Sequence, residues 1–145
     1  MNWREEATEK LRKYDAMRQA LTNISEELDR LEEEAQAIRS VQFDGPAVDT
    51  TMDRKQEEKL LNNLIQRQEL TINYHQAESW LRTADRALGT LSSQEQLLLQ
   101  KLYICPERGS LSRLCSELGV EQSSIYRRRD KALHRFTLAL YGVES

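Results

Sequence analysis

The residues best suited to chemistry lie between Gln122 and Arg135. This segment contains a single acidic residue, Asp130, and five basic ones: Arg127, Arg128, Arg129, Lys131 and Arg135. Arginine binds phosphate oxygens and the guanine edge bidentately, and glutamine pairs with the adenine edge. This combination predicts contact with both the backbone and the base edges of a nucleic-acid duplex.

If this run forms a helix with Ile125 turned inward, the 100° step per residue places Ser123, Arg127 and Asp130 on the opposite face. Gln122 lies at the helix start, where contact with the major groove is usual. We therefore predict base contacts from Gln122, Ser123, Tyr126 and Arg127. Phosphate contacts, which give affinity without sequence information, are predicted from Arg113, Ser124, Arg128 and Lys131.

A helix-turn-helix is the element that would present this face. Short and long helices are predicted over 110–118 and 122–141, with a tight turn at Gly119, where a left-handed backbone favours glycine. Cys115 supplies a small residue at the helix crossing. The apolar residues that join the two helices are Leu114, Leu118, Val120 and Ile125.

A preceding helix begins with a capping box formed by Ser92 and Glu95. It is followed by a loop over 105–109. We expect a three-helix core in this region, completed by Leu91, Leu98, Leu102, Leu133 and Phe136.

Residues 3–39 carry a coiled-coil pattern, because apolar residues recur at alternating steps of three and four. The apolar members of this heptad series are Trp3, Ala7, Tyr14, Met17, Leu21, Ile24, Leu28, Leu31, Ala35 and Ile38. Lys10 is the single polar member of this series. A turn is predicted over about 40–51, where Asp44-Gly45-Pro46 stands. A second helix follows from about 52 to 88 and ends at Gly89-Thr90. Its apolar residues are Leu60, Leu61, Leu64, Ile65, Leu70, Tyr74, Ala77, Leu81, Ala84 and Leu88.

The predicted fold is therefore all-α: a long antiparallel helical hairpin over 1–89, then a three-helix helix-turn-helix domain over 90–145. A hairpin this narrow leaves apolar surface over, notably Trp80. This surplus indicates a homodimer formed through the N-terminal helices.

The net charge of −3 is unevenly distributed along the chain. Residues 1–90 hold 13 Lys+Arg and 18 Asp+Glu, whereas residues 91–145 hold 8 and 6. The positive excess thus falls on the segment that would face nucleic acid.

Other classes of function find little support in the sequence. It contains no glycine-rich phosphate loop and no nucleophile with a base at recognisable spacing, which favours a non-enzyme without a cofactor. Cys105, Cys115, His75 and His134 do not make a metal-site motif. Two cysteines, no long apolar span and no apolar signal core indicate a cytoplasmic protein without a membrane partner.

The C-terminal part also contains a series of short motifs. They are LSSQE at 91–95, LL at 98–99, LY at 102–103, LCSELGV at 114–120, SIYRR at 124–128 and AL at 132–133. This series resembles region 4 of bacterial sigma factors, and within that group phage-encoded regulators of the ArpU and RinA type. Those regulators have a similar Tyr-Arg run and a similar Leu-Tyr-Gly ending, here at 140–142.

The resemblance implies a sequence-specific regulator of late or packaging genes in a phage, prophage or mobile element. Double-stranded DNA would be its ligand, with host RNA polymerase as a candidate partner. Related sequences often have an apolar residue where Arg128 and Arg129 stand here, so we expect the alkyl stems of these arginines to cover the core edge.

Two alternatives remain open. One is a small terminase-like subunit for DNA packaging, which would also join a helix-turn-helix to helical oligomerisation elements. The other is a coiled-coil adaptor or anti-sigma-like protein with a vestigial helix-turn-helix, an alternative that the negative net charge favours.

Overall fold

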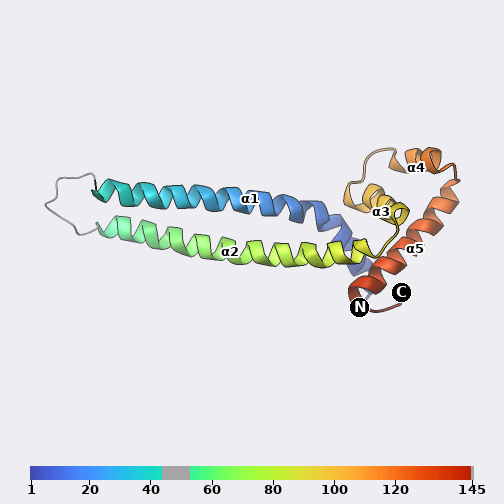
Figure 1. Cartoon of the computed structure of the whole chain (residues 1–145), viewed down its shortest axis with the longest axis horizontal. Coiled ribbons are helices and arrows are strands. Elements are labelled where there is room, and N and C mark those ends of the chain that lie inside the picture. The colour runs from blue at the N-terminus through green and yellow to red at the C-terminus, as the bar shows by residue number, and fades with distance from the viewer. Residues whose placement is uncertain (44–52, 145) are drawn as a thin grey trace. The chain divides into compact units, whose positions relative to one another are not determined.

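The computed structural model describes residues 1–43 and 53–144, and this part of the chain is helical without a strand. The elements, shown in Figure 1, are α1 (Trp3–Phe43), α2 (Arg54–Gly89), α3 (Ser93–Leu99), the π-helical turn η1 (Gln100–Ile104), α4 (Ser110–Leu118) and α5 (Gln122–Tyr141). The predicted all-α class is confirmed, together with the long helical hairpin and the short helices after it.

The first helix extends a few residues into the turn predicted over about 40–51. Helix α1 continues to Phe43. The physical reason is that 40–43 contain neither glycine nor proline, so nothing in the backbone stops the helix where the heptad pattern ends. The predicted turn at Asp44-Gly45-Pro46 lies outside the described residues.

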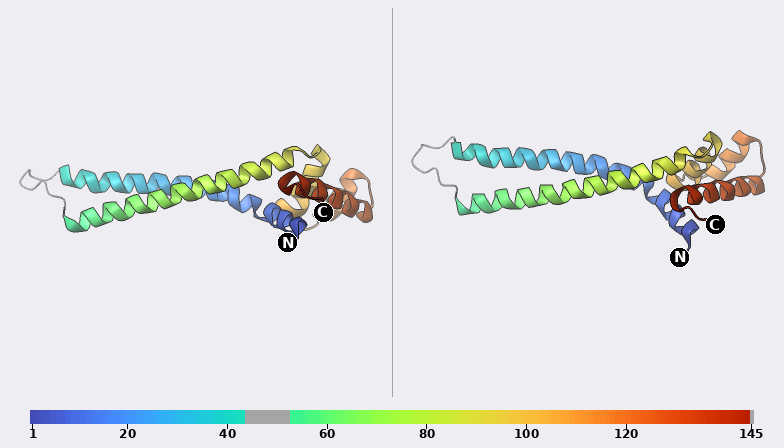
Figure 2. Two further views of the ribbon diagram at one scale, coloured as in Figure 1. Left: turned by 90° about the horizontal axis from the view of Figure 1, so that it is seen from below. Right: turned by 60° about the horizontal axis from the view of Figure 1, so that its bottom comes forward.

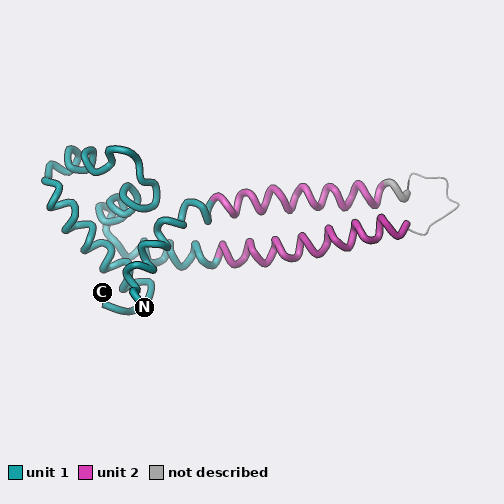
Figure 3. The backbone as a smooth tube through the Cα atoms, turned by 180° about the vertical axis from the view of Figure 1, so that it is seen from behind, with its two compact units in different colours: residues 1–18, 79–145 teal, residues 19–78 magenta. Residues whose placement is uncertain are grey.

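The chain divides into two compact units, coloured separately in Figure 3. Unit 1 comprises Met1–Arg18 and Ser79–Ser145, and unit 2 comprises Gln19–Glu78. The ends of both long helices thus share a compact unit with α3, α4 and α5. The independent domain predicted over 90–145 stays a prediction.

In unit 2, α1 and α2 lie side by side and run in opposite directions (Figures 1 and 2). On α1 the predicted heptad positions are the protected ones: Leu31 and Ala35 are buried, and Leu28 is half-buried. On α2, Ala77 is buried and Tyr74 is half-buried. The hairpin therefore forms along the predicted coiled-coil positions of α1.

A buried asparagine lies in the middle of this hairpin. The Asn63 side chain is 3% exposed, and its Nδ2 donates a hydrogen bond to the backbone carbonyl of Leu31 at 2.8 Å. Its Oδ1 accepts one from Nε of Arg67 at 2.8 Å. With Asn63 and Arg67 facing α1, the neighbouring apolar residues Leu61 and Ile65 turn outward. From the sequence pattern alone, both side chains are expected in the contact between the two long helices.

Unit 1 has two buried clusters, because α5 is too long for α3 and α4 to cover. At 20 residues α5 is roughly 30 Å long. Its first half contributes Ile125 to a cluster with Leu98 and Leu114. Its second half packs on the ends of α1 and α2 in a cluster of Ala7, Leu11, Ala87, Leu91, Leu99, Ala132, Leu133 and Phe136.

The single three-helix core predicted from the sequence is therefore wrong in its grouping. Leu98 and Leu102 belong to the first cluster, whereas Leu91, Leu133 and Phe136 belong to the second. Leu11, which falls outside the heptad series, is 1% exposed because it packs in the second cluster.

The junction between α2 and α3 also differs from expectation. Helix α2 ends at Gly89 as predicted, but Gly89 lacks the positive φ of a left-handed glycine cap. Its terminal carbonyls accept from both backbone and side chains. The Ala87 carbonyl accepts from the Thr90 N–H at 3.2 Å and from Thr90 Oγ1 at 2.7 Å, and the Leu88 carbonyl accepts from the Leu91 N–H at 3.1 Å and from Gln96 Nε2 at 2.9 Å. The predicted capping box of Ser92 and Glu95 is confirmed.

Candidate nucleic-acid interface

Helices α4 and α5 are joined by a tight left-handed turn. Gly119 has φ 64°, a conformation that L side chains rarely adopt, and the backbone N–H of Val120 donates to the Cys115 carbonyl at 3.1 Å. Leu114 is 1% exposed and Ile125 0%, so the two helices meet through these side chains. This is the helix-turn-helix arrangement that the sequence predicted for 110–141.

The inward position of Ile125 decides which residues of α5 face solvent. Ser123, Arg127 and Asp130, which the 100° step places opposite Ile125, are all exposed. Gln122, in the first turn, is exposed as well. The polar face predicted to contact bases is thus directed away from the core.

Two of the predicted base-contacting residues bind each other. Gln122 Nε2 donates a hydrogen bond to the Tyr126 hydroxyl at 2.9 Å. The guanidinium of Arg129 lies over the Tyr126 ring at 4.9 Å from its centroid, within the range of a cation–π contact. Tyr126 is therefore held from both sides, and it orients the Gln122 amide at the start of the helix.

The residues predicted to contact phosphates are divided between two helices. On α4, Arg113 forms an ion pair with Glu107 at 3.0 Å, and both side chains are at least 60% exposed. On α5, Lys131 is exposed, whereas Ser124 and Arg128 are half-buried. Because the Arg113 pair is exposed, a phosphate could replace the carboxylate at little cost in free energy.

That the alkyl stems of Arg128 and Arg129 cover the core edge stays a prediction. Both residues are half-buried, although they occupy positions where an apolar side chain would be usual. The Arg129 guanidinium also contacts the Asp130 carboxylate at 3.0 Å.

Sequence reasoning missed Arg4, at the start of α1. Its guanidinium contacts the Asp130 carboxylate at 3.2 Å and donates to the Asp130 backbone carbonyl at 3.1 Å. Nearby, the Trp3 and Tyr141 rings lie 4.8 Å apart. The start of α1 thus borders the exposed face at Asp130, and the first two turns of α5 remain open. No sequence signal relates positions so far apart in the chain.

Charge separates the two units more sharply than the sequence halves suggested. Unit 1 holds 15 Lys+Arg and 11 Asp+Glu, a net charge of +4, whereas unit 2 holds 6 and 13, a net charge of −7. Within the described residues, no side chain caps the first turn of α5. The backbone N–H groups of that turn add a partial positive charge beside Gln122 and Ser123.

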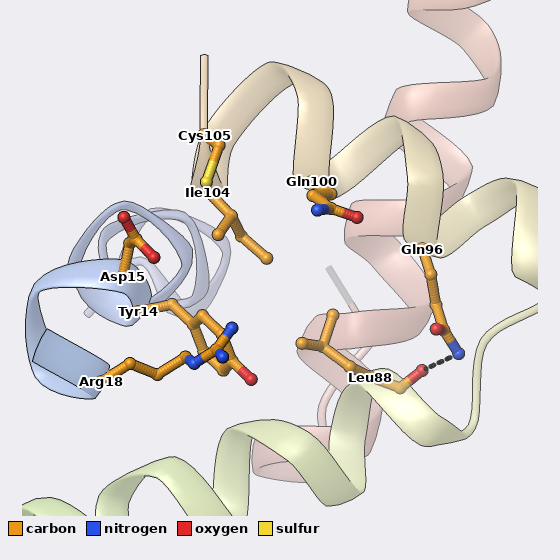
Figure 4. Close-up of a pocket in the computed structure, with 8 residues that line it drawn as sticks. All are labelled: Tyr14, Asp15, Arg18, Leu88, Gln96, Gln100, Ile104 and Cys105. Carbon is orange, nitrogen blue, oxygen red and sulfur yellow. Dashed lines mark hydrogen bonds between the residues drawn. The ribbon is translucent and has the colours of Figure 1, made fainter. Parts of the chain in front are cut away.

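A cavity of about 180 Å³ lies elsewhere in unit 1, lined by α1, α2, α3 and η1 (Figure 4). Tyr14, on its α1 side, donates a short hydrogen bond to Asp85. Burial and then this hydrogen bond raise the pKa of Tyr14 to about 12. Among the residues that line this cavity, no nucleophile lies beside an activating base. This observation does not test the prediction that the protein is not an enzyme.

Among residues 1–43 and 53–144, no three His, Cys, Asp or Glu side chains gather as metal ligands do. In the same part, no helix combines the length and the apolar character needed to cross a membrane. No protein-family model, curated protein or solved structure matches the chain.

Proposed function

We propose that the protein is a sequence-specific DNA-binding regulator of transcription, from a phage, prophage or mobile element, acting in the cytoplasm. The observation that carries this proposal is the orientation of α5: Ile125 is fully buried against α4, while Ser123 and Arg127 on the opposite side are exposed. A helix held from behind with its polar first turns open suits insertion into a major groove.

The first two turns of α5 provide the proposed base contacts. Arg127 would bind guanine bidentately, and Gln122, positioned by Tyr126, would pair with adenine. Ser123 lies between them on the same exposed face and accepts or donates with less selectivity.

The charged residues around that face supply most of the proposed affinity for DNA. Arg113 on α4 and Arg128 and Lys131 on α5 are the proposed cationic phosphate contacts, and Ser124 is the proposed uncharged one. The net charge of +4 on unit 1 favours this assignment, whereas unit 2, at −7, would be repelled by a phosphate backbone. Three such contacts per chain give a slope of about −3 for log affinity against log salt.

The test is selection of bound duplexes from a random pool, followed by affinity measurements on the selected and a scrambled duplex. The proposal expects enrichment of a defined sequence and salt-dependent binding. A variant with Arg127, Arg128 and Arg129 all replaced by Ala should lose both. Enrichment of no sequence, with equal affinity of the triple variant for DNA, would leave only a helical scaffold.

The two alternatives predict different outcomes in further measurements. A terminase-like packaging subunit would form a ring of many copies, which native mass spectrometry would detect. A coiled-coil adaptor would keep its protein partner after the triple substitution. Within our proposal, host RNA polymerase is the candidate partner of the acidic α1 surface of unit 2, and pull-down with purified polymerase tests it.

A further inference from the structure

Unit 2 exposes a row of large apolar side chains along α2. Leu61 is 56% exposed, Leu64 42%, Ile65 44% and Ile72 57%. Asn63, which faces α1, is 3% exposed, and the 100° step places Leu61, Ile65 and Ile72 about 160–180° around the helix from it. Leu61, Ile65 and Ile72 therefore lie on the side of α2 away from α1. Leu64, about 100° around the helix from Asn63, flanks them. These four aliphatic residues are here called the outer stripe.

The spacing of the outer stripe is that of a second coiled-coil seam. Leu61, Ile65, Gln68 and Ile72 follow one another at steps of four, three and four. These steps assign Leu61 and Gln68 to heptad d positions, and Ile65 and Ile72 to a positions. In parallel coiled coils, isoleucine at a with leucine at d favours two strands over three or four, and Gln68 is the polar member of this seam.

Charge identifies the occupant of this seam. Residues 60–77 of α2 contain one arginine and one glutamate, so their formal charge is zero, whereas residues 19–38 of α1 contain six acids and one arginine. A basic partner would bind the acidic helix α1. The neutral outer stripe suits an identical neutral stripe, which meets it without like-charge repulsion.

The position of the outer stripe also keeps the acidic helices apart. In a pair joined through α2, each α1 lies on the far side of its own α2. With helix axes roughly 8–10 Å apart, the two α1 helices would be separated by about 25–30 Å. That distance exceeds the screening length of about 8 Å at physiological salt, so the acidic surfaces hardly repel each other.

We propose that two copies of this chain associate through the outer stripe as a parallel two-stranded coiled coil. The stripe offers roughly 300–400 Å² of apolar surface, the size of the largest apolar patch on a typical monomer, and such a patch is often functional. A stable dimer buries about 800 Å² on each partner, so neighbouring polar residues of α2 must join the contact. We expect a dimer that dissociates measurably on dilution to micromolar concentrations.

This surface differs from the one that the sequence indicated. Trp80 is half-buried, and the Lys10 ammonium lies 5.2 Å from the centre of its ring. The polar member of the α1 heptad series thus covers the tryptophan expected to be available for a partner. The outer stripe belongs to unit 2 and the proposed DNA contacts belong to unit 1, so the proposal does not depend on DNA binding.

Disulfide trapping in the full-length chain tests the parallel arrangement. In a background of Cys105→Ser and Cys115→Ala, Gln68→Cys should form a covalent dimer on mild oxidation, because parallel d positions face each other. Gln66→Cys, an exposed b position on the same helix, is the matched control and should give at least tenfold less. Equal trapping at both positions overturns the proposal. Efficient trapping only between separate Leu61→Cys and Ile72→Cys chains shows an antiparallel pair and also overturns it.

Sedimentation without DNA tests the stripe itself. Ile65→Glu with Ile72→Glu should raise the dissociation constant at least tenfold, while circular dichroism stays unchanged because both side chains are exposed. Gln66→Glu with Asn73→Glu adds the same charge to the same helix and should leave association intact. A wild-type chain that stays monomeric at about 100 µM overturns the proposal, because even a weak pair would associate at that concentration. Equal effects of the two double variants also overturn it.

Discussion

Unit 1 and unit 2 bury their side chains very differently. Unit 1 encloses two clusters that include Phe136, Leu99, Leu98 and Ile125 at 1% exposure or less. Among the described residues of unit 2, the buried side chains are Leu31, Ala35, Asn63 and Ala77. A single hairpin cannot enclose more, because each helix has one neighbour within the unit. The difference teaches that unit 1 has the buried core to support the proposed DNA-binding face, whereas unit 2 leaves apolar surface exposed for the proposed second copy.

The largest expected effect comes from the same substitution made in each unit. Leu99 is 0% exposed and Leu31 1% exposed, so both side chains leave water on folding. Leu99→Ala should lower the free energy of unfolding by about 4 kcal/mol, because several elements surround the resulting cavity. Leu31→Ala should lower it by about 2 kcal/mol, because a two-helix contact can close over the missing atoms. Urea unfolding followed by circular dichroism measures both.

An exposed leucine provides the control for this pair. Leu61→Ala should change the stability of the monomer by less than about 0.5 kcal/mol, since its side chain is 56% exposed. If Leu31→Ala lowered the free energy of unfolding as much as Leu99→Ala, the two units would not differ in how extensively they surround a buried leucine.

The next effect concerns the two classes of contact within unit 1. Arg127→Ala should weaken binding to the selected duplex by about 10- to 100-fold, because a bidentate base contact contributes about 1–3 kcal/mol. Its effect on a scrambled duplex should be much smaller. Lys131→Ala should weaken binding to both duplexes equally and lower the salt slope by about one. Fluorescence anisotropy at several salt concentrations separates these outcomes, and equal losses for Arg127→Ala on both duplexes would contradict base reading.

Much of the local structure could be predicted because local signals specify it. The capping box at Ser92 and Glu95, the left-handed turn at Gly119 and the limits of α5 each depend on residues a few positions apart. The outward direction of Ser123 and Arg127 followed from helical geometry once Ile125 was taken as buried.

The remaining features depend on contacts between distant segments. The Arg4 contact with Asp130, the burial of Leu11 and the Lys10 contact with Trp80 join positions that no local pattern relates. At Asn63 the sequence pattern predicts the wrong residues for the hairpin contact. The asparagine is buried where Leu61 and Ile65 were expected, because its amide hydrogen-bonds a backbone carbonyl and an arginine.

Titration offers a smaller effect that also belongs to unit 1. Burial and the hydrogen bond to Asp85 raise the pKa of Tyr14 from 10.0 to about 12. The folded state therefore favours the neutral phenol: this contribution to stability is full below pH 10 and is lost as the pH rises from 10 to 12. Tyr14→Phe should cost about 1 kcal/mol at pH 8, since it removes one hydrogen bond to a carboxylate.

Absorbance of tyrosinate over pH 9–13 checks this expectation. The wild type should show a late-titrating component that Tyr14→Phe reduces, and its stability advantage over the variant should shrink between pH 10 and 12. Because burial and Glu6 also raise the pKa of Tyr141, a Tyr141→Phe variant is needed to assign the rest. An advantage that stayed constant to pH 12 would contradict the role of the Asp85 hydrogen bond.

The smallest effect compares two ion-paired arginines, one from each unit. Arg4 pairs with Asp130 in unit 1, and Arg30 pairs with Glu34 in unit 2. All four side chains are at least 36% exposed, so each Ala substitution should cost only about 0.2–1 kcal/mol of stability. Affinity for DNA should distinguish them: Arg4→Ala removes positive charge beside the open turns of α5 and weakens binding about two- to fivefold, whereas Arg30→Ala leaves it unchanged. A similar loss from both variants would show that net charge alone, and not its position beside α5, governs binding.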